Sequence, residues 1–378
     1  MNFVTRYATS TSIDSLYFQF MPLRPFTIKN IVISPNLILA PMSGVTNSCF
    51  RRLVKRENPH AVGLVVTEFI SVEALTRENE QSLRMMRFHE EERPISIQIF
   101  GHEIQRMTDA AKMAVDAGAD IVDINCGCPV PKVVRKGGGC ELMRQPAHLG
   151  TLLERVRRAI EPTPLSVKIR SGWDESSRNA LEIARIAESA GVSALTVHGR
   201  TRSALYRGKA DWDIVAQVAR ALSIPVFGSG DVVSAESAKC ALFSGVSAIM
   251  IGRAALAEPW IFSELHSALS GIGIAYERPG AMETIGVMER YLALLLEELP
   301  ERAVMGRMKQ FASQVTRRVH GSSSIRRALC MSKTLLEFRG ILSMWSELLA
   351  NSKAGPSANG SGAADEVRAR SALPMEMC

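Results

Sequence analysis

The stretch Ala117-Gly-Ala-Asp-Ile-Val-Asp-Ile-Asn125 decides the fold of this chain, because it joins the end of a helix directly to a buried strand. Gly118 suits the left-handed position that ends a helix, and residues 121–125 form an apolar run typical of a strand. The pattern recurs at 190–198 (Ala-Gly-Val-Ser, then a run) and at 244–251 (Ser-Gly-Val-Ser, then a run). A repeated unit of helix, glycine and strand indicates parallel strands joined by helices.

Outward from this unit, short apolar runs and amphipathic stretches alternate between residues 31 and 265. The runs are rich in Val and Ile and do not alternate with polar residues, as expected for strands buried on both faces. They lie at 37–39, 64–67, 95–100, 121–125, 165–169, 194–198, 224–227 and 248–251. Amphipathic helices are expected at 104–116, 149–160, 179–189 and 235–243. Eight strands alternating with helices predict a (β/α)8 TIM barrel, with a doubly wound open sheet as the structural alternative.

The remainder of the chain predicts three further parts. Residues 1–30 are expected to be a leader, in part disordered, and 31–265 the barrel. Periodicity at 282–299 and 305–339 indicates a small C-terminal helical domain over 275–345, rich in Arg and Lys. The Ser/Gly/Ala-rich segment 351–378 is expected to be a disordered tail.

Composition narrows the class of protein. The chain has 378 residues, of which 46% are hydrophobic and 22% charged, which is ordinary for a globular protein. A net charge of +7 favours anionic partners such as nucleic acid. No apolar run approaches the ~18 residues that a membrane helix needs. The chain shows no secretory signal, and its 7 cysteines have irregular spacing, so we expect free thiols in the cytoplasm.

Polar residues directly after the strand runs are the candidates for chemistry, since barrel active sites form where strands end. Glycine-rich turns at 228–231 and 252–253 expose backbone N–H groups beside a following helix and predict a phosphate site, although they would also serve as tight turns. Lys168 and Gln98 interrupt apolar strands and need polar partners, which a flavin ring would provide. For Lys168, a phosphate or solvent at the barrel mouth is the alternative partner. His198 is either such a partner or a core histidine. Their recurrence at successive strand ends favours a binding site.

Residues 123–139 form the densest candidate segment. Cys128 lies in a Gly-Cys-Pro turn just past a strand, followed by basic residues and three glycines. Cys126, Cys128 and Cys140 also suggest a metal, but a fourth ligand at matched spacing is missing from the sequence. We therefore expect a thiol role for Cys128 and no metal.

Together these motifs resemble the dihydrouridine synthase family of flavoenzymes, in particular its bacterial branch. The Asn-x-Gly-Cys-Pro element at 125–129 is the most specific of them. The other motifs are Ala-Pro-Met-Ser-Gly-Val-Thr (40–46), Ile-Gln-Ile-Phe-Gly (97–101), Val-Lys-Ile-Arg-Ser-Gly-Trp (167–173), Leu-Thr-Val-His-Gly-Arg-Thr-Arg (195–202), Gly-Ser-Gly-Asp-Val (228–232) and Ile-Gly-Arg (251–253). Ser229 stands where the family usually has Asn, and Asn47 where it often has Asp.

The resemblance implies a reaction and a set of site residues. NADPH would reduce FMN, whose N5 would then pass hydride to C6 of a uridine in tRNA or another structured RNA, while Cys128 gives a proton to C5. The implied cofactor-binding residues are Pro41, Met42, Ser43, Gln98, Lys168, His198, Ser229, Gly230, Asp231, Gly252 and Arg253. The implied substrate-binding residues are Asn125, Arg170 and Arg200. The helical domain would bind RNA, and we expect a monomer without a protein partner.

Three alternatives stay open on sequence grounds. An FMN barrel could reduce a free pyrimidine or a small enone, which would not need a basic helical domain. A sugar-phosphate barrel enzyme without flavin could use Gln98, Lys168 and His198 for another ligand. A non-catalytic RNA-binding protein could retain the barrel as a scaffold, although it would have no need of Cys128.

Overall fold

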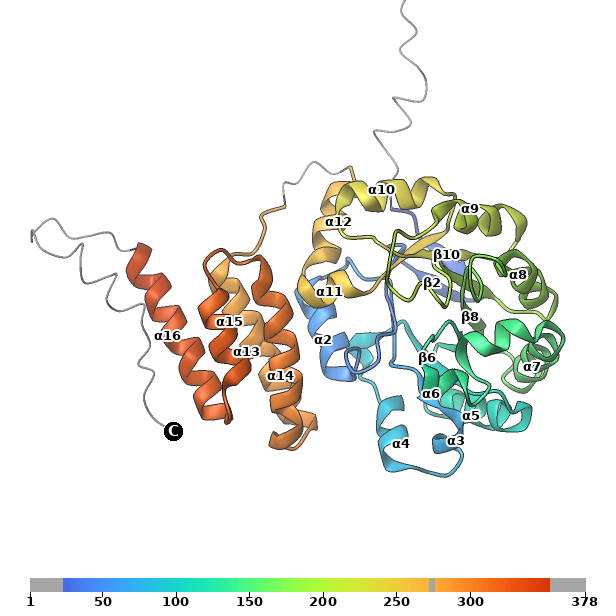
Figure 1. Ribbon diagram of the computed structural model, residues 1–378, viewed down its shortest axis with the longest axis horizontal. Helices are drawn as coiled ribbons and strands as arrows, with labels where there is room; N and C mark the ends of the chain where they lie inside the picture. The colour runs from blue at the N-terminus through green and yellow to red at the C-terminus, as the bar shows by residue number, and fades with distance from the viewer. Residues whose placement is uncertain (1–22, 272–275, 354–378) are drawn as a thin grey trace, which may run out of the picture.

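Eight parallel strands close into a barrel in the computed structural model, which describes residues 23–271 and 276–353 (Figure 1). The strands are β3 (Leu37–Leu39), β4 (Leu64–Val66), β6 (Ile95–Phe100), β7 (Ile121–Cys126), β8 (Leu165–Arg170), β9 (Ala194–His198), β10 (Val226–Ser229) and β11 (Ala248–Ile251). Each pairs in parallel with the next, and β11 pairs with β3 to close the ring. A short strand, β5 (Ile70–Ser71), pairs with the end of β6. The predicted TIM barrel is confirmed.

Both faces of the strands are buried, which explains their continuous apolar runs. Outward side chains such as Val122 and Ile124 join the core between strands and helices. Inward side chains such as Ile38, Ile121 and Phe227 form a second core inside the barrel. Side chains alternate along a strand, so Asp123 and Asn125 of β7 face the same interior as Ile121 but nearer the C-terminal ends. The interior is therefore apolar toward one end and polar toward the other.

A β-hairpin supplies part of the interior core. Strands β1 (Phe26–Ile28) and β2 (Ile31–Ile33) pair antiparallel, and Ile28 and Ile33 pack into the apolar interior. The ring centroids of Phe26 and Phe227 lie 5.4 Å apart. Part of the predicted leader thus forms a strand that covers the barrel, while residues 1–22 lie outside the described residues.

Helices surround the barrel as Figure 1 shows. They are α2 (Ser48–Glu57), α5 (Ile104–Asp116), α7 (Pro146–Ala159), α8 (Ala180–Ser189), α9 (Trp212–Ala221), α10 (Ala235–Phe243), α11 (Arg253–Ala257) and α12 (Ile261–Leu269), with the shorter α3 (Val72–Leu75), α4 (Glu80–Met86) and α6 (Pro131–Val134). Short 3-10 turns lie at Glu90–Glu92 and Gly139–Arg144. No helix within the described ranges is long and apolar enough to cross a membrane.

Four helices after the barrel pack into a bundle beside α2 and α11 (Figure 1). They are α13 (Ala281–Glu298), α14 (Glu301–Val315), α15 (Ser323–Met331) and α16 (Leu335–Lys353), with a 3-10 turn at Thr316–Arg318. The ring of Phe50 on α2 lies 6.0 Å from that of Tyr291 and 6.2 Å from that of Phe311. Apolar packing therefore joins the bundle to the barrel. Residues 354–378, most of the predicted tail, lie outside the described residues.

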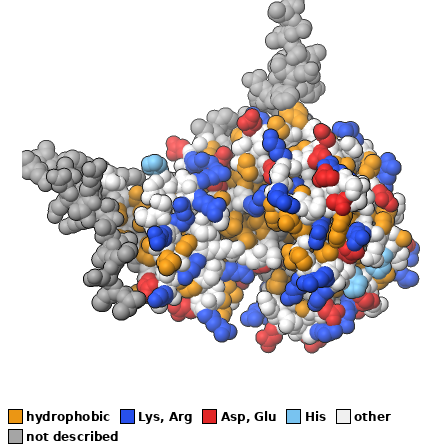
Figure 2. Space-filling model, viewed as in Figure 1, with side chains coloured by type: hydrophobic (Ala, Val, Ile, Leu, Met, Phe, Trp, Pro, Cys, Tyr) orange, Lys and Arg blue, Asp and Glu red, His pale blue; other side chains and the backbone are white. Residues whose placement is uncertain are grey.

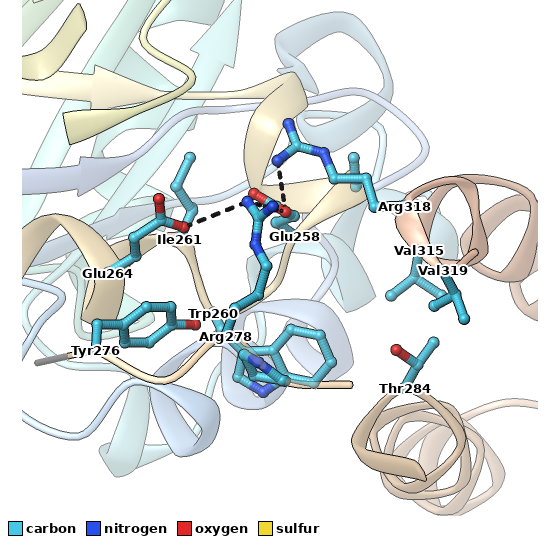
Figure 3. A pocket seen from close by; sticks show the side chains of 12 residues that line it. Glu258, Trp260, Ile261, Glu264, Tyr276, Arg278, Thr284, Val315, Arg318 and Val319 are labelled. Atoms are coloured by element: carbon cyan, nitrogen blue, oxygen red, sulfur yellow. Dashed lines mark ion pairs between the residues drawn. The ribbon is translucent and has the colours of Figure 1, made fainter. Parts of the chain in front are cut away.

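An ion-pair network closes a second part of this junction, around a small pocket (Figure 3). Oε1 of Glu258 lies 2.6 Å from Arg278 and 2.5 Å from Arg318 of the bundle. The side chain of Glu258 is 10% exposed, and its second oxygen, Oε2, has no hydrogen-bond partner among the described residues. The carboxylate is thus held by charge from two other segments of the chain.

Candidate active site at the barrel mouth

The polar interior residues and the loops after the strands meet at the C-terminal mouth of the barrel. Asn125 and Lys168 are register partners on β7 and β8, as are Arg170 and His198 on β8 and β9. A Cβ atom placed on Gly230 would lie 3.3 Å from Cδ2 of His198. Around the ring, a Cβ on Gly252 would lie 3.7 Å from Sδ of Met42. The fold thus gathers the predicted residues into one site.

The turn that contains Cys128 is fixed by neighbouring side chains. Oδ1 of Asn125 accepts hydrogen bonds from the backbone N–H groups of Gly127 (3.1 Å) and Cys128 (2.8 Å). Nε of Arg170 donates to the carbonyl of Gly127 at 2.8 Å. Gly139 has φ +60, and a Cβ there would lie 2.6 Å from the carbonyl oxygen of Cys128. Glycine is therefore required at 139, and the position of Cys128 is defined from three sides.

The thiol of Cys128 is suited to hold a proton. Burial raises its pKa, against smaller lowering effects of the Val130 backbone N–H and of Arg170. Burial also raises the pKa of Cys140 to about 12. An ordinary thiol is already mostly protonated at neutral pH, so the Cys128 thiol carries its proton there.

Lys168 gives the site a cationic edge, and His198 lies within reach of its charge. Burial, followed by repulsion from Arg170, lowers the pKa of Lys168 to about 8. Its ammonium has no hydrogen-bond or ion-pair partner within the part of the chain that the structure describes. Burial, then repulsion from Lys168 and three arginines, lowers the pKa of His198 to about 2, so its ring is neutral. A partly buried ammonium without a partner is unfavourable, which favours an anionic or carbonyl-rich ligand here.

The turns after β10 and β11 form a cradle for an anion. In the described residues, the backbone N–H groups of Gly230, Asp231, Gly252 and Arg253 donate no hydrogen bond. Gly230 has φ +131, and a Cβ there would come within 2.5 Å of Ala210. Arg253 is exposed at the mouth, 4.7 Å from the ring of Tyr206. Unpaired N–H groups with an adjacent arginine are the donors that a phosphate needs.

Arg170 and Arg200, predicted to bind substrate, bind the protein itself. NH1 of Arg170 donates to the carbonyls of Thr201 and Leu205, at 2.9 Å each. Arg200 pairs with Asp231, and Asp231 in turn accepts from the N–H of Ala210. Both arginines thus position the loop after β9 rather than project freely into the mouth.

Pro41, Met42 and Ser43 form the turn after β3. Oγ1 of Thr46 accepts from the N–H of Met42 at 2.9 Å, and Gly44 donates its N–H to Glu68. Sequence reasoning missed Glu68, which follows a strand run as the other candidates do. It also missed Asp123, a fully interior carboxylate within the quoted Cys motif.

A cleft of about 850 Å³ lies beside this turn, between the barrel and the bundle. Its lining includes Ser43 and Gly44 of the barrel mouth and five arginines. Arg51 is buried against Glu92, and the other four are Arg84, Arg87, Arg302 and Arg307. Figure 2 shows Lys and Arg side chains on this face of both the bundle and the barrel. Arg307 of α14 lies 3.6 Å from Oε1 of Glu68. The cleft therefore joins a basic surface to the candidate site.

Metal ligands are not grouped in the described residues, where no cluster of three or more His, Cys, Asp or Glu side chains could hold an ion. The site consists instead of a protonated thiol, a cationic edge and an anion cradle.

A closed barrel with this mouth defines a (β/α)8-barrel enzyme whose residues fit a phosphorylated cofactor. The family model for dihydrouridine synthase matches residues 38–344. The chain therefore belongs to the dihydrouridine synthase family and is an oxidoreductase.

Curated relatives agree with this family, and a solved structure shares the fold. The chain is 45% identical to tRNA-dihydrouridine synthase B of Pseudomonas putida, over 65% of this chain and 70% of the relative. It is 40% identical to a probable tRNA-dihydrouridine synthase of Rhodobacter capsulatus, over 71% of this chain and 82% of that one. Histamine dehydrogenase from Rhizobium sp. 4-9 shares the fold, with a TM-score of 0.51 at 12% identity over 72% of this chain and 50% of that one.

Proposed function

We propose that this enzyme reduces uridine to 5,6-dihydrouridine in tRNA, with FMN as cofactor, NADPH as reductant and Cys128 as proton donor. Bound FMN would supply the hydride for C6 of the uracil. The observation that carries the proposal is the geometry of Cys128, a buried and protonated thiol fixed at the barrel mouth by Asn125, Arg170 and Gly139. The names of the relatives supply tRNA as the substrate.

The residues of this chain fit such a cofactor. The unpaired N–H groups after β10 and β11, with Arg253, would hold its phosphate. The unpaired ammonium of Lys168 and the neutral ring of His198 would face polar atoms of its ring system. Gln98 would contribute an amide there, while Pro41, Met42 and Ser43 would line the ring.

Cys128 would then move one proton. Reduction of the C5=C6 bond adds hydride at C6 and a proton at C5. The thiol gives this proton to C5 and becomes a thiolate, which regains a proton from solvent. Because its pKa is raised, the thiol is fully protonated before each turnover.

The cleft would bind the RNA. The target base has to leave the RNA stack to reach the mouth, which costs a few kcal/mol. Phosphate contacts from the arginines at the cleft would offset this cost. We also propose that the enzyme acts in the cytoplasm, where tRNA is found, and that it acts as a monomer.

The test uses the visible spectrum of the purified protein and the RNA product. We expect flavin absorption that bleaches with NADPH in the absence of air, and dihydrouridine in tRNA after addition of unmodified transcript. Cys128→Ala should keep the bleaching and lose the product. The exposed Cys240 on α10 provides the control, since Cys240→Ala should behave as wild type.

The other outcomes favour the alternatives. A colourless protein that takes up no FMN would make the sugar-phosphate enzyme the better hypothesis. A flavoprotein that reduces a free pyrimidine or enone but not tRNA would assign it to the small-molecule reductases. A Cys128→Ala variant with full tRNA activity would remove the thiol from the mechanism.

A further inference from the structure

Three buried polar side chains form a continuous chain of hydrogen bonds inside the barrel. Nε2 of Gln98 donates to Oδ2 of Asp123 at 2.6 Å, and Oε1 of Gln98 accepts from Nδ2 of Asn125 at 2.8 Å. Oδ1 of Asn125 accepts from the N–H of Cys128 at 2.8 Å. Each of the three side chains is almost completely buried. These hydrogen bonds thus connect the Asp123 carboxylate in the barrel interior to the turn that contains the Cys128 thiol.

The groups at the two ends of this chain of hydrogen bonds fix the orientation of the Asn125 and Gln98 amides. Gly127 and Cys128 present backbone N–H groups, which only an oxygen can accept, so Oδ1 of Asn125 must face the turn. Its NH2 group then faces Gln98, which must present Oε1. The NH2 group of Gln98 therefore requires an acceptor at the far end, and Asp123 supplies it. Without that acceptor, the buried NH2 group of Gln98 would be left unpaired, which is unfavourable.

We propose that Asp123 is a positioning residue for Cys128 and acts through Gln98 and Asn125. This inference rests on the proposed function, in which Cys128 is the proton donor. Asp123 keeps both amides in the one arrangement that holds the Gly127–Cys128 turn.

The surroundings of Asp123 favour this role over a purely structural one. Its other oxygen, Oδ1, accepts from Oγ of Ser166 at 2.5 Å, and the positive charge of Lys168 acts on the carboxyl group. Burial raises the pKa of Asp123 despite these partners. A carboxyl group in a barrel interior is costly, and an apolar side chain would fill the space without that cost. The carboxyl therefore has a task that an apolar residue cannot perform.

The test compares Asp123→Ala with Asp123→Asn and Ser166→Ala in the full-length holoenzyme. In Asp123→Asn, the new side chain retains an oxygen for Gln98 and can donate its NH2 to Ser166, so the chain of hydrogen bonds to Cys128 persists. Ser166→Ala removes the second partner of Asp123 but leaves the chain to Cys128 intact. Of the three substitutions, only Asp123→Ala removes the acceptor for the NH2 group of Gln98. The alanine variant should therefore differ from the other two.

Alkylation by iodoacetamide reports on the turn without reference to activity. The rate at Cys128 is divided by the rate at exposed Cys240, with each site quantified by mass spectrometry. We expect this ratio to rise about 10-fold or more in Asp123→Ala, as the loss of a buried hydrogen bond implies. It should stay within about twofold of wild type in Asp123→Asn and Ser166→Ala.

Kinetics separate the thiol from the cofactor. In Asp123→Ala, the rate of flavin reduction by NADPH should remain close to wild type, while the rate of tRNA reduction falls by about 10²-fold, as expected for a misplaced group. An unchanged alkylation ratio in Asp123→Ala would overturn the proposal. So would an equal loss of flavin reduction and tRNA reduction, or an Asn variant as impaired as the Ala variant. If the wild type makes no dihydrouridine, the proposed function fails, and the alkylation ratio still tests the positioning role.

Discussion

One terminal nitrogen of Arg200, NH2, lies 2.7 Å from both carboxylate oxygens of Asp231, which joins the loop after β9 to the turn after β10. The same nitrogen donates to the carbonyl of Gly208 at 2.7 Å, and Nε donates to the carbonyl of Arg207 at 3.2 Å. The side chain of Arg200 is only 3% exposed. Asp231 has φ +55, a left-handed conformation that few residues other than glycine adopt. The arginine therefore stabilises the strained turn that forms the anion cradle.

Arg200→Lys should weaken FMN binding. A lysine retains the charge but cannot reach Asp231 and two carbonyls at once, because it lacks the planar fork of donors. Loss of one or two charge-assisted hydrogen bonds corresponds to an increase in Kd of about 10- to 100-fold. Titration of the apoprotein with FMN, followed by flavin fluorescence, measures this. Arg220→Lys on the outer helix α9 is the control, and equal affinity in both variants would show that the cradle does not depend on Arg200.

His198 should make the apoprotein sensitive to acid. Its pKa is lowered from 6.5 to about 2 by burial and by the cations Lys168, Arg170, Arg200 and Arg253. Below pH 6.5 the unfolded chain binds a proton that the folded chain does not, so stability falls as the pH falls. Compared with His198→Gln, the wild type should lose about 1.4 kcal/mol more per pH unit below 6.5.

Urea unfolding between pH 7 and pH 4.5 measures this difference. His320→Gln, at an exposed position of the bundle, should follow the wild type at every pH. Parallel curves for the wild type and His198→Gln would mean that the ring takes up a proton in the folded protein, contrary to its burial among cations.

Binding of tRNA should depend on salt through the arginines of the cleft. Arg84, Arg87 and Arg302 line the cleft and form no ion pair with any described residue. If each contacts one phosphate, replacing one of them by alanine should reduce the slope of log K against log salt by about 0.7–0.9. Filter binding at several salt concentrations gives the slope. Arg185→Ala on α8, on the opposite side of the barrel in Figure 1, should leave it unchanged. An unchanged slope in all three cleft variants would place the RNA elsewhere.

Much of the fold was predictable because a buried parallel strand is apolar on both faces. Helices 104–116 and 235–243 begin and end where their periodicity predicts. The strand predicted at 224–227 instead spans Val226–Ser229. Gly228 and Ser229 suggested a turn, but a Cβ on Gly228 would lie 2.3 Å from the ring of Trp212, so this glycine is needed for packing within the strand.

The positions of the site residues were predictable from the sequence, but their hydrogen-bond partners were less so. Residues after strands converge because the barrel closes, which sequence spacing implies. The partners of Arg170 and Arg200 are backbone carbonyls in a loop that no local pattern describes. Helix α16 continues to Lys353, past the predicted end at 339, because Gly340 lies inside the helix and does not end it. Asp123 was missed as a site residue because only the pairing of β6 and β7 brings it beside Gln98.

At the junction between barrel and bundle, loss of the negative charge and loss of a positive charge should change the free energy of unfolding by different amounts. Glu258 is buried with one oxygen unpaired, whereas its partners Arg278 and Arg318 are 55% and 41% exposed. Glu258→Gln leaves two arginines that water can solvate, so the free energy of unfolding should change by about 0.5 kcal/mol or less. Arg318→Ala leaves the buried carboxylate with a single cation and should cost about 1–2 kcal/mol.

A double-mutant cycle measured by urea unfolding tests this asymmetry. In the Glu258→Gln background, Arg318→Ala should cost almost nothing, because no buried charge remains to be stranded. Arg327→Ala, an exposed change on α15, is the control for loss of a positive charge from the bundle. Additive effects of the two substitutions would contradict the cycle, since they would mean that Arg318 stabilises the junction by packing and not through the carboxylate.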